Sequence, residues 1–261
     1  MNARFCFPRP ASGFAAHGGT AGRSISLCAG GQRLADHCHA AVRGARRLCT
    51  LVSSDTFPSA AAIKNQTDNG YVQSFTLTGS QTVNGQSYRV AGSGTVTVSA
   101  AVASTFEGQS ALLSNQAVSG SLQVKGVTAP FSSTAQEYAT PSYALFGIVV
   151  TIPPNPSSEY CVMQGSPTVP VTVKVGDSGA IGTCTCYTDS SKTTALGTRQ
   201  VSYVVQAHTE HTAIIKLVEQ DYDSGLALQL TDQVSWRIDT NANLTWVSET
   251  ATVPTHTYVF K

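Results

Sequence analysis

The chain has 261 residues, of which 12% are charged and 41% are hydrophobic. This length can bury a full core, and the hydrophobic content excludes a wholly disordered chain. The net charge of +1 hides an asymmetry: residues 1–50 carry seven arginines and one acid, whereas the remainder carries nine bases and fourteen acids, a net −5. The acidic main region argues against nucleic-acid binding. Since no apolar run reaches about 18 residues, we also expect no transmembrane segment.

Residues 1–57 form a basic N-terminal segment that we expect to be poorly ordered. Residues 1–50 show no strand alternation and lack the apolar core of a secretory signal. Three interpretations stay open: a wrongly assigned start that replaces an export signal, an Arg-rich organelle transit peptide, or a basic arm. Residues 51–70 resemble a linker, because Phe57-Pro58 interrupts regular structure and the stretch ends in polar, turn-forming residues.

Residues 58–152 are predicted to form a first β unit, in which two-residue alternation begins at Tyr71. Asn84-Gly85 is typical of a tight hairpin between two strands. Tyr143–Ile152 is a continuous apolar run, as expected for a strand that is buried on both faces. Three prolines within residues 153–156 cannot continue a sheet, so they mark the best internal boundary.

Residues 157–261 are predicted to form a second β unit, which either stands alone or shares one domain with the first. Val171, Val173 and Val175 alternate with polar residues, the pattern of a strand with one buried face. Further alternating runs separated by short turns predict a C-terminal antiparallel meander. The fold class that we predict is therefore all-β, with antiparallel sandwich-like sheets and a disordered or weakly ordered segment of about 55 residues before them.

Three of the seven cysteines lie in the second unit. Cys184 and Cys186 point to the same face of a strand, and Cys161 stands just before a predicted strand. A bond from Cys161 to either partner closes a loop of about 25 residues and contributes about 3 kcal/mol in the chain-entropy model. We predict the pair Cys161–Cys186, with Cys184 left over. Free thiols are one alternative, and a zinc site from these thiolates with His208 or His211 is another. C-x-C is tighter than the usual zinc spacing, so no cofactor is expected.

A second motif, Gly176-Asp177-Ser178-Gly179, resembles the nucleophile motif of chymotrypsin-like serine proteases. The upstream Ala35-Asp36-His37-Cys38 is similar to the histidine motif of that family. The resemblance implies Ser178 as nucleophile and His37 as base. The chain departs from the family at Ala180, where a second glycine is expected, and no motif for the third member stands out. An ordinary Asp/Gly turn explains the same residues.

Two acidic turns place oxygen ligands at alternate positions, as calcium loops do. One contains Asp221 and Asp223, and the other contains Asp239 and Asn241. Leu244 replaces the glycine of an EF-hand loop, and turn chemistry accounts for both stretches without a metal. These four residues are the candidate metal ligands.

From Tyr71 onward the chain resembles uncharacterised secreted or envelope proteins of bacteria, lipoprotein-like β-proteins rich in serine and threonine. This resemblance has no diagnostic motif, and it implies an extracellular or cell-envelope location. We expect a non-catalytic structural, adhesion or ligand-binding module, whose partner is an unknown ligand or an envelope component. A serine hydrolase using Ser178 and a metal-stabilised binding module are the alternatives, and the oligomeric state stays open.

Overall fold

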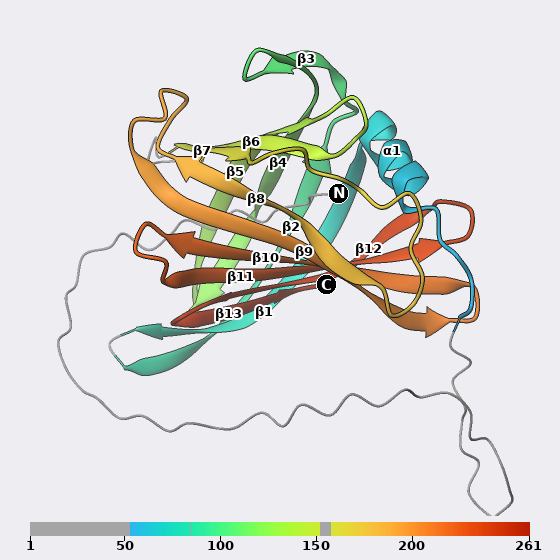
Figure 1. The fold of residues 1–261 in the computed structure, drawn as a ribbon. Coiled ribbons are helices and arrows are strands. Elements are labelled where there is room, and N and C mark those ends of the chain that lie inside the picture. The colour runs from blue at the N-terminus through green and yellow to red at the C-terminus, as the bar shows by residue number, and fades with distance from the viewer. Residues whose placement is uncertain (1–52, 84, 152–157) are drawn as a thin grey trace, which may run out of the picture. The chain divides into compact units, whose positions relative to one another are not determined.

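One helix and thirteen strands make up the part of the chain that the computed structural model describes, which is residues 53–83, 85–151 and 158–261 (Figure 1). Residues 1–52, and so most of the segment 1–57 that we predicted to be poorly ordered, lie outside the described residues. The elements are α1 (Ser59–Asn69), β1 (Tyr71–Val83), β2 (Gln86–Val98), β3 (Val102–Phe106), β4 (Gln109–Val124), β5 (Val127–Ala139), β6 (Leu145–Thr151), β7 (Ser158–Met163), β8 (Ser178–Tyr187), β9 (Ala195–Thr209), β10 (Thr212–Asp223), β11 (Leu228–Asp239), β12 (Leu244–Val253) and β13 (His256–Phe260).

Twelve of these strands form a closed antiparallel barrel. Neighbouring strands follow the order β2-β1-β13-β12-β11-β10-β9-β8-β7-β6-β5-β4, and β4 returns to pair with β2. This closing contact joins residues 90–98 of β2 to residues 116–124 of β4. The short strand β3 pairs with the first part of β4 and stays outside the closed ring. The all-β class is thus confirmed, whereas the prediction of sandwich-like sheets is wrong.

The error has a physical cause, because alternation shows that one face of a strand is buried but not what covers that face. The inner face of a barrel and the inner face of a sandwich produce the same two-residue period. Closure also needs strong local curvature, which glycine permits. A Cβ atom at Gly94, on the inner face of β2, would lie 2.5 Å from the ring of Phe75 on β1. The glycine therefore lets β1, β2 and the aromatic ring come close together.

The predicted meander is the longest regular part of the barrel. Each strand from β5 to β13 pairs with the next along the chain, so strands on both sides of residues 152–157 share one sheet. β10 shows the division between faces: Ala213, Ile215 and Leu217 are buried, and the intervening Ile214 and Lys216 are partly exposed. The buried side chains meet those of the other strands in one apolar cluster inside the barrel.

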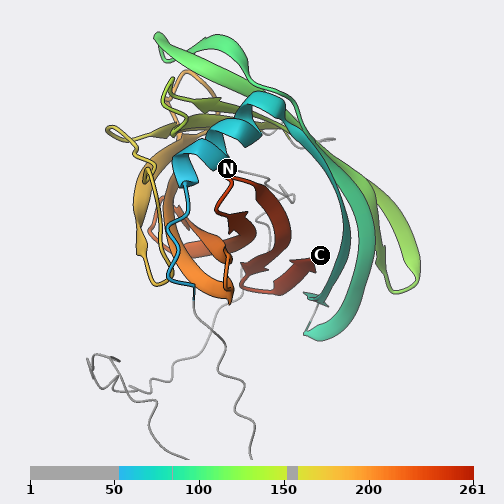
Figure 2. The same cartoon turned by 90° about the vertical axis from the view of Figure 1, so that its right-hand side faces the viewer.

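The predicted linker contains α1, which lies across one end of the barrel (Figure 2). Alanine-rich residues favour a helix after Pro58, and Ala62 and Ile63 face the barrel core. The helix ends at Gly70, whose φ of 64° is easily adopted by glycine. A Cβ atom there would lie 2.3 Å from the carbonyl oxygen of Val98. A helix of 11 residues is marginal alone, so this packing against the barrel stabilises it.

Residues 164–177, between β7 and β8, form a strap beside α1. The predicted strand at Val171–Val175 is wrong, because this segment makes only one isolated bridge, between Val173 and Phe57. Two backbone hydrogen bonds of 2.8 and 2.9 Å join these residues. Val173 is 2% exposed and Val171 is 76% exposed. The alternation thus reflects a strap that inserts one valine into the core.

A second small core lies on the outer face of β5, β6 and β7, beneath the β3–β4 hairpin. Phe106 stacks on Tyr138 with ring centroids 4.4 Å apart and lies 5.3 Å from the ring of Tyr160. Gly147 of β6 leaves the space for this ring, because a Cβ atom there would lie 2.1 Å from Phe106 Cε1. Phe106 therefore packs the hairpin against the barrel and requires a glycine beneath its ring. Glu107 at the turn of the hairpin adds a hydrogen bond of 2.6 Å from Tyr160 Oη.

We predict that Gly147→Ala lowers the free energy of unfolding by about 1–3 kcal/mol, because the added methyl group displaces the Phe106 ring. In a Phe106→Ala background the same substitution should cost much less, since the obstructing ring is gone. Urea denaturation of the four proteins in this cycle measures the difference. An equal cost of Gly147→Ala in both backgrounds would contradict the contact.

Candidate functional site

An apolar cavity lies between α1, the strap and the inner face of β6 and β8–β10. We call it the cap cavity. The centre of a water-sized sphere can reach about 60 Å³ of this cavity, which is partly open to solvent. Most of the lining is aliphatic, and the polar contributions come from a serine and two tyrosines. The lining residues are Ser59, Ile63, Tyr143, Leu145, Val169, Pro170, Val173, Ile181, Val201, Tyr203, Ile215 and Leu217. Such a concave apolar surface with few polar groups is typical of a small-molecule site.

The polar groups at the cavity are held by specific hydrogen bonds. Ser59 Oγ donates to the carbonyl oxygen of Pro170 at 2.6 Å, which ties the start of α1 to the strap. Lys64 Nζ donates to Tyr143 Oη at 2.8 Å and lies 4.8 Å from the centroid of that ring. Lys64 also pairs with Asp68 one turn along the helix. Hydrogen bonds to Asp68 and Tyr143 raise the pKa of Lys64 to about 12. The cavity edge therefore carries a permanent cation.

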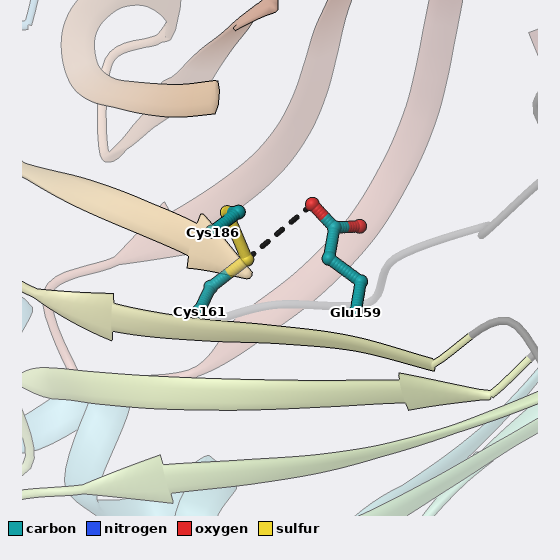
Figure 3. A group of neighbouring side chains, drawn as sticks. All are labelled: Glu159, Cys161 and Cys186. Carbon is teal, nitrogen blue, oxygen red and sulfur yellow. Dashed lines mark hydrogen bonds between the residues drawn. A yellow bond between two sulfur atoms is a disulfide. The ribbon is translucent and has the colours of Figure 1, made fainter. Parts of the chain in front are cut away.

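A disulfide joins Cys161 of β7 to Cys186 of β8, with an S–S distance of 2.06 Å (Figure 3). The two residues are direct partners in the ladder. Cys161 Sγ lies 3.4 Å from Glu159 Oε1. Because a disulfide sulfur has no hydrogen to donate, this is a contact rather than a hydrogen bond. The disulfide closes the chain segment that contains the strap.

The third sulfur belongs to Cys184, which is buried on β8 and takes no part in the disulfide. Its Sγ lies 2.9 Å from Met163 Sδ on β7. Glu159, Cys161 and Cys186 bring potential metal ligands within 4.8 Å of one another. However, only a thiolate is an effective ligand, and the two sulfurs are bonded to each other. In its oxidised form this group does not provide a metal site.

Beside the disulfide, Arg199 of β9 is buried within a cluster of carboxylates. Its Nε and Nη2 atoms donate to the two oxygens of Asp221 at 2.6 and 2.8 Å. Glu159 lies 3.2 Å from Nη2, and Glu219 lies 3.9 Å from Nε. Burial acts to lower the pKa of Arg199, but the three carboxylates outweigh this effect and hold the pKa above its ordinary value. The cluster is an ion-pair network that satisfies buried charges.

Further acidic side chains face the barrel interior. Glu219 and Asp232 are direct cross-strand partners on β10 and β11, and both are buried. On the same face of β11 as Asp232, the ring of Trp236 packs edge-on against the ring of Tyr71 of β1, with centroids 5.7 Å apart. Burial, together with the charges of Glu137 and Glu249, raises the pKa of Tyr71 well above its ordinary value. The interior is thus partly polar, unlike the cap cavity.

The structure places Ser178 at the first residue of β8, in an exposed position after a turn. Asp177 Oδ2 accepts a hydrogen bond of 2.8 Å from the backbone N–H of Lys174, three residues earlier in the same turn. His37 lies outside the described residues. Within the described part of the chain, no hydrogen bond links Ser178 to a histidine or a carboxylate, so the geometry here supplies no catalytic pair.

The four candidate metal ligands do not come together. Asp221 faces the barrel interior and binds Arg199. Asp223 Oδ1 accepts hydrogen bonds of 2.9 Å from the N–H groups of Gly225 and Ala227. Asp239 Oδ1 accepts the N–H groups of Asn241 and Asn243 at 2.9 and 3.0 Å. The carboxylates of Asp223 and Asp239 thus cap backbone N–H groups of their own turns.

Burial acts to raise the pKa of Asp239, but hydrogen bonds from Asn243 and Asn241 outweigh it and lower that pKa. The two histidines considered as zinc ligands also have separate partners. His208 Nδ1 lies 2.7 Å from Thr212 Oγ1. His211 Nδ1 lies 3.1 Å from Asp55 Oδ2, and this hydrogen bond raises the pKa of His211. Neither imidazole is hydrogen-bonded to Cys161, Cys184 or Cys186.

Neither the Arg199 cluster nor the cap cavity was predicted from the sequence. The sequence does contain a local signal for the Arg199 cluster, because Glu219 and Asp221 continue the buried alternation of β10 after Leu217. A charge at a core position predicts a buried partner. The cap cavity has no local signal in the sequence, since its lining comes from a helix, the strap and several strands far apart in the chain.

Comparisons with known proteins add little. No protein-family model matches the chain, and no curated protein matches it. Among solved structures, the chain is similar to the crystal structure of a DUF1329 family protein from Desulfovibrio piger, with 8% sequence identity and a TM-score of 0.27. This similarity covers 78% of the present chain and 91% of the other, and at such a score it carries no argument about function. Within the described residues, no helix is sufficiently long and apolar to span a bilayer.

We predict that replacing both Cys161 and Cys186 with alanine lowers the free energy of unfolding by about 3 kcal/mol, because the open chain gains conformational entropy when it unfolds. Thermal denaturation with and without dithiothreitol measures the effect. Reductant should lower the Tm of the wild type and of Cys184→Ala, but not that of the double variant. A Cys184→Ala protein that no longer responds to reductant would show that Cys184 forms the bond.

Arg199→Met should lower the free energy of unfolding by about 3–5 kcal/mol at neutral pH, because it leaves buried carboxylates without their cation. Protonation neutralises those carboxylates, so the difference from the wild type should shrink as the pH falls towards 4.5. Arg237→Met on the exposed face of β11 is the matched control and should change stability little. Equal effects of the two substitutions would contradict the role of the cluster.

Proposed function

We propose that the chain is an exported, non-catalytic β-barrel protein that binds a small apolar ligand in the cap cavity. The observation that carries this proposal is the aliphatic lining of the cavity, where the strap and α1 meet the barrel interior. Of the roles considered from the sequence, ligand binding is the one that this geometry favours over a purely structural or adhesive one.

The composition of the cavity supports an apolar ligand. Ile181, Ile215 and Leu217 present branched aliphatic surface, and burial of such surface contributes about 25 cal/mol per Å². Tyr143 and Lys64 provide polar groups at the edge, where they can orient a ligand without interrupting the apolar wall. Ligand sites in barrels are commonly found at the mouth.

The cap and the barrel share one core. The Phe57–Val173 bridge and the Ser59–Pro170 hydrogen bond join α1 and the residues before it to the strap. Phe57, Ala62 and Val173 are buried in the main apolar cluster together with side chains of the barrel strands. A ligand in the cap cavity would therefore contact both the cap and the barrel.

Two features support export. The Cys161–Cys186 disulfide is of a kind that persists in oxidising compartments, and the strand surface is poor in charge and rich in serine and threonine. The resemblance of residues 71–261 to secreted or envelope proteins also supports export. The hydrolase and metal alternatives have less support. Ser178 is exposed at the start of β8 without a histidine or carboxylate partner among the described residues, and Asp223 and Asp239 cap backbone N–H groups.

Decanol is a suitable neutral probe, and we expect isothermal titration to show saturable binding of it to the full chain. Ile181→Trp fills the cavity and should weaken this binding at least tenfold, because the bulkier ring takes the ligand's space. Ile214→Trp is the matched control on the outer side of β10 and should bind like the wild type.

Absence of saturable binding to the wild type would remove the proposal. Equal weakening by Ile181→Trp and Ile214→Trp would also contradict it, because the loss would then reflect a general effect of the substitution. Circular dichroism of both variants verifies that each is folded.

A further inference from the structure

We propose that an open groove at the seam where β2 pairs with β4 binds a phosphate monoester, and that Arg89 and Lys125 hold the phosphate group. We call this groove the seam groove. It lies beside the turns that follow β1 and β4, at the ends of these strands away from α1 (Figure 1). The proposal does not depend on the cap cavity or on its ligand. The lining residues are Tyr88, Arg89, Ala91, Gln123, Lys125 and Gly126.

The strands that form this seam carry almost no charge. Residues 70–106 and 108–136, which include β1–β4 and most of β5, contain no aspartate, glutamate or histidine. Their only charged residues are Arg89 and Lys125. Residues 51–261 as a whole carry nine bases and fourteen acids, a net −5. The seam groove is therefore a local positive site on an otherwise acidic part of the chain, which directs anions to it.

The pairing that closes the barrel brings these two cations to one place. The ladder between β2 and β4 ends at the pair Val90–Val124, and Arg89 and Lys125 are the next residues of the chain beyond that pair. Both are exposed. Among the described residues, neither forms an ion pair with a carboxylate. Like charges at neighbouring positions of adjacent strands repel each other. An anion bound between them would therefore remove an unfavourable interaction.

The side chains around the groove leave hydrogen-bond donors available to an anion. Lys125 Nζ lies 3.6 Å from the centroid of the Tyr88 ring, and this contact holds the ammonium group without a carboxylate. The guanidinium of Arg89 is a planar fork that can donate to two oxygens of one phosphate. The amide of Gln123 adds two N–H donors. A Cβ atom at Gly126 would meet no atom within 4 Å, so the groove is open on that side.

The charge of the groove selects the class of anion. Arg89 and Lys125 contribute two positive charges, and a phosphate monoester carries a charge close to −2 above its second pKa of about 6. A sulfate monoester also presents three terminal oxygens, but its single negative charge leaves one cation uncompensated. Water and salt screen both cations because they are exposed, so we expect only about a fivefold preference for the phosphate. A lipid head group and a soluble ester present the same phosphate.

The test is a titration of the ¹⁵N-labelled full chain with phenyl phosphate and with phenyl sulfate at pH 8 and low ionic strength, followed at the backbone amides of Gln123 and Gly126. The wild type should bind phenyl phosphate saturably and about fivefold more tightly than phenyl sulfate. Arg89→Gln and Lys125→Gln should each weaken the binding of phenyl phosphate about fivefold and remove most of its advantage. Arg89→Lys keeps the charge but loses the fork, so its affinity should be intermediate. Lys216→Gln, on the outer side of β10, is the control and should match the wild type.

Cosedimentation with vesicles distinguishes the two sources of the phosphate. Binding to vesicles that contain phosphatidate, but not to vesicles of phosphatidylcholine alone, would support the proposal with a lipid as the source, and Arg89→Gln should lose this binding. Saturable binding of phenyl phosphate without vesicle binding would support it with a soluble ester as the source.

Three results would overturn the proposal: no saturable binding of phenyl phosphate to the wild type, equal affinity for the two esters, or undiminished affinity in both Arg89→Gln and Lys125→Gln. Because the two side chains are exposed and of like charge, neither substitution should lower the Tm. A thermal scan of each variant therefore separates a loss of binding from a loss of folding.

Discussion

The pairing of β2 with β4 is the contact on which the rest of the structure depends. It converts an open sheet into a closed ring, so the twelve strands of the barrel satisfy their backbone groups on both edges. Closure also creates an interior, and every feature of interest follows from that enclosure. The apolar core, the Arg199 cluster and the cap cavity all occupy the space that the closing contact defines. The strap and α1 are needed only because a closed barrel still has open ends.

The interior separates into two chemical environments. At the capped end, Val173 and Phe57 insert apolar groups, and the cavity wall is aliphatic. Elsewhere in the interior, Arg199 forms ion pairs with carboxylates from β7 and β10, and this network lies next to the disulfide. Buried charges of this kind are costly without partners, so each carboxylate of the network depends on the guanidinium of Arg199. This division leaves the capped end as the part of the barrel suited to an apolar ligand.

Local sequence signals predicted local structure and little beyond it. The Asn84-Gly85 motif and the alternation in β9–β12 correctly indicated that β1 pairs with β2, that β9 pairs with β10, and that the fold is all-β. The same alternation at Val171–Val175 was misleading, because a strap that buries one valine between exposed neighbours has the period of a strand. Closure into a barrel and the convergence of Glu159 with Arg199 depend on residues far apart in the chain. No short window of sequence contains that information.

The partnership between β1 and β13 has a consequence for how the protein is made. Leu77 of β1 pairs with Phe260 of β13, and Phe260 is completely buried. Residues 84–255, or 172 residues, must therefore be translated after β1 before β13, its second partner strand, is made. Until then one edge of β1 and one edge of β12 lack their partner, and such unpaired edges are aggregation-prone in a nascent chain. The closed ring can form only after β13 has been translated.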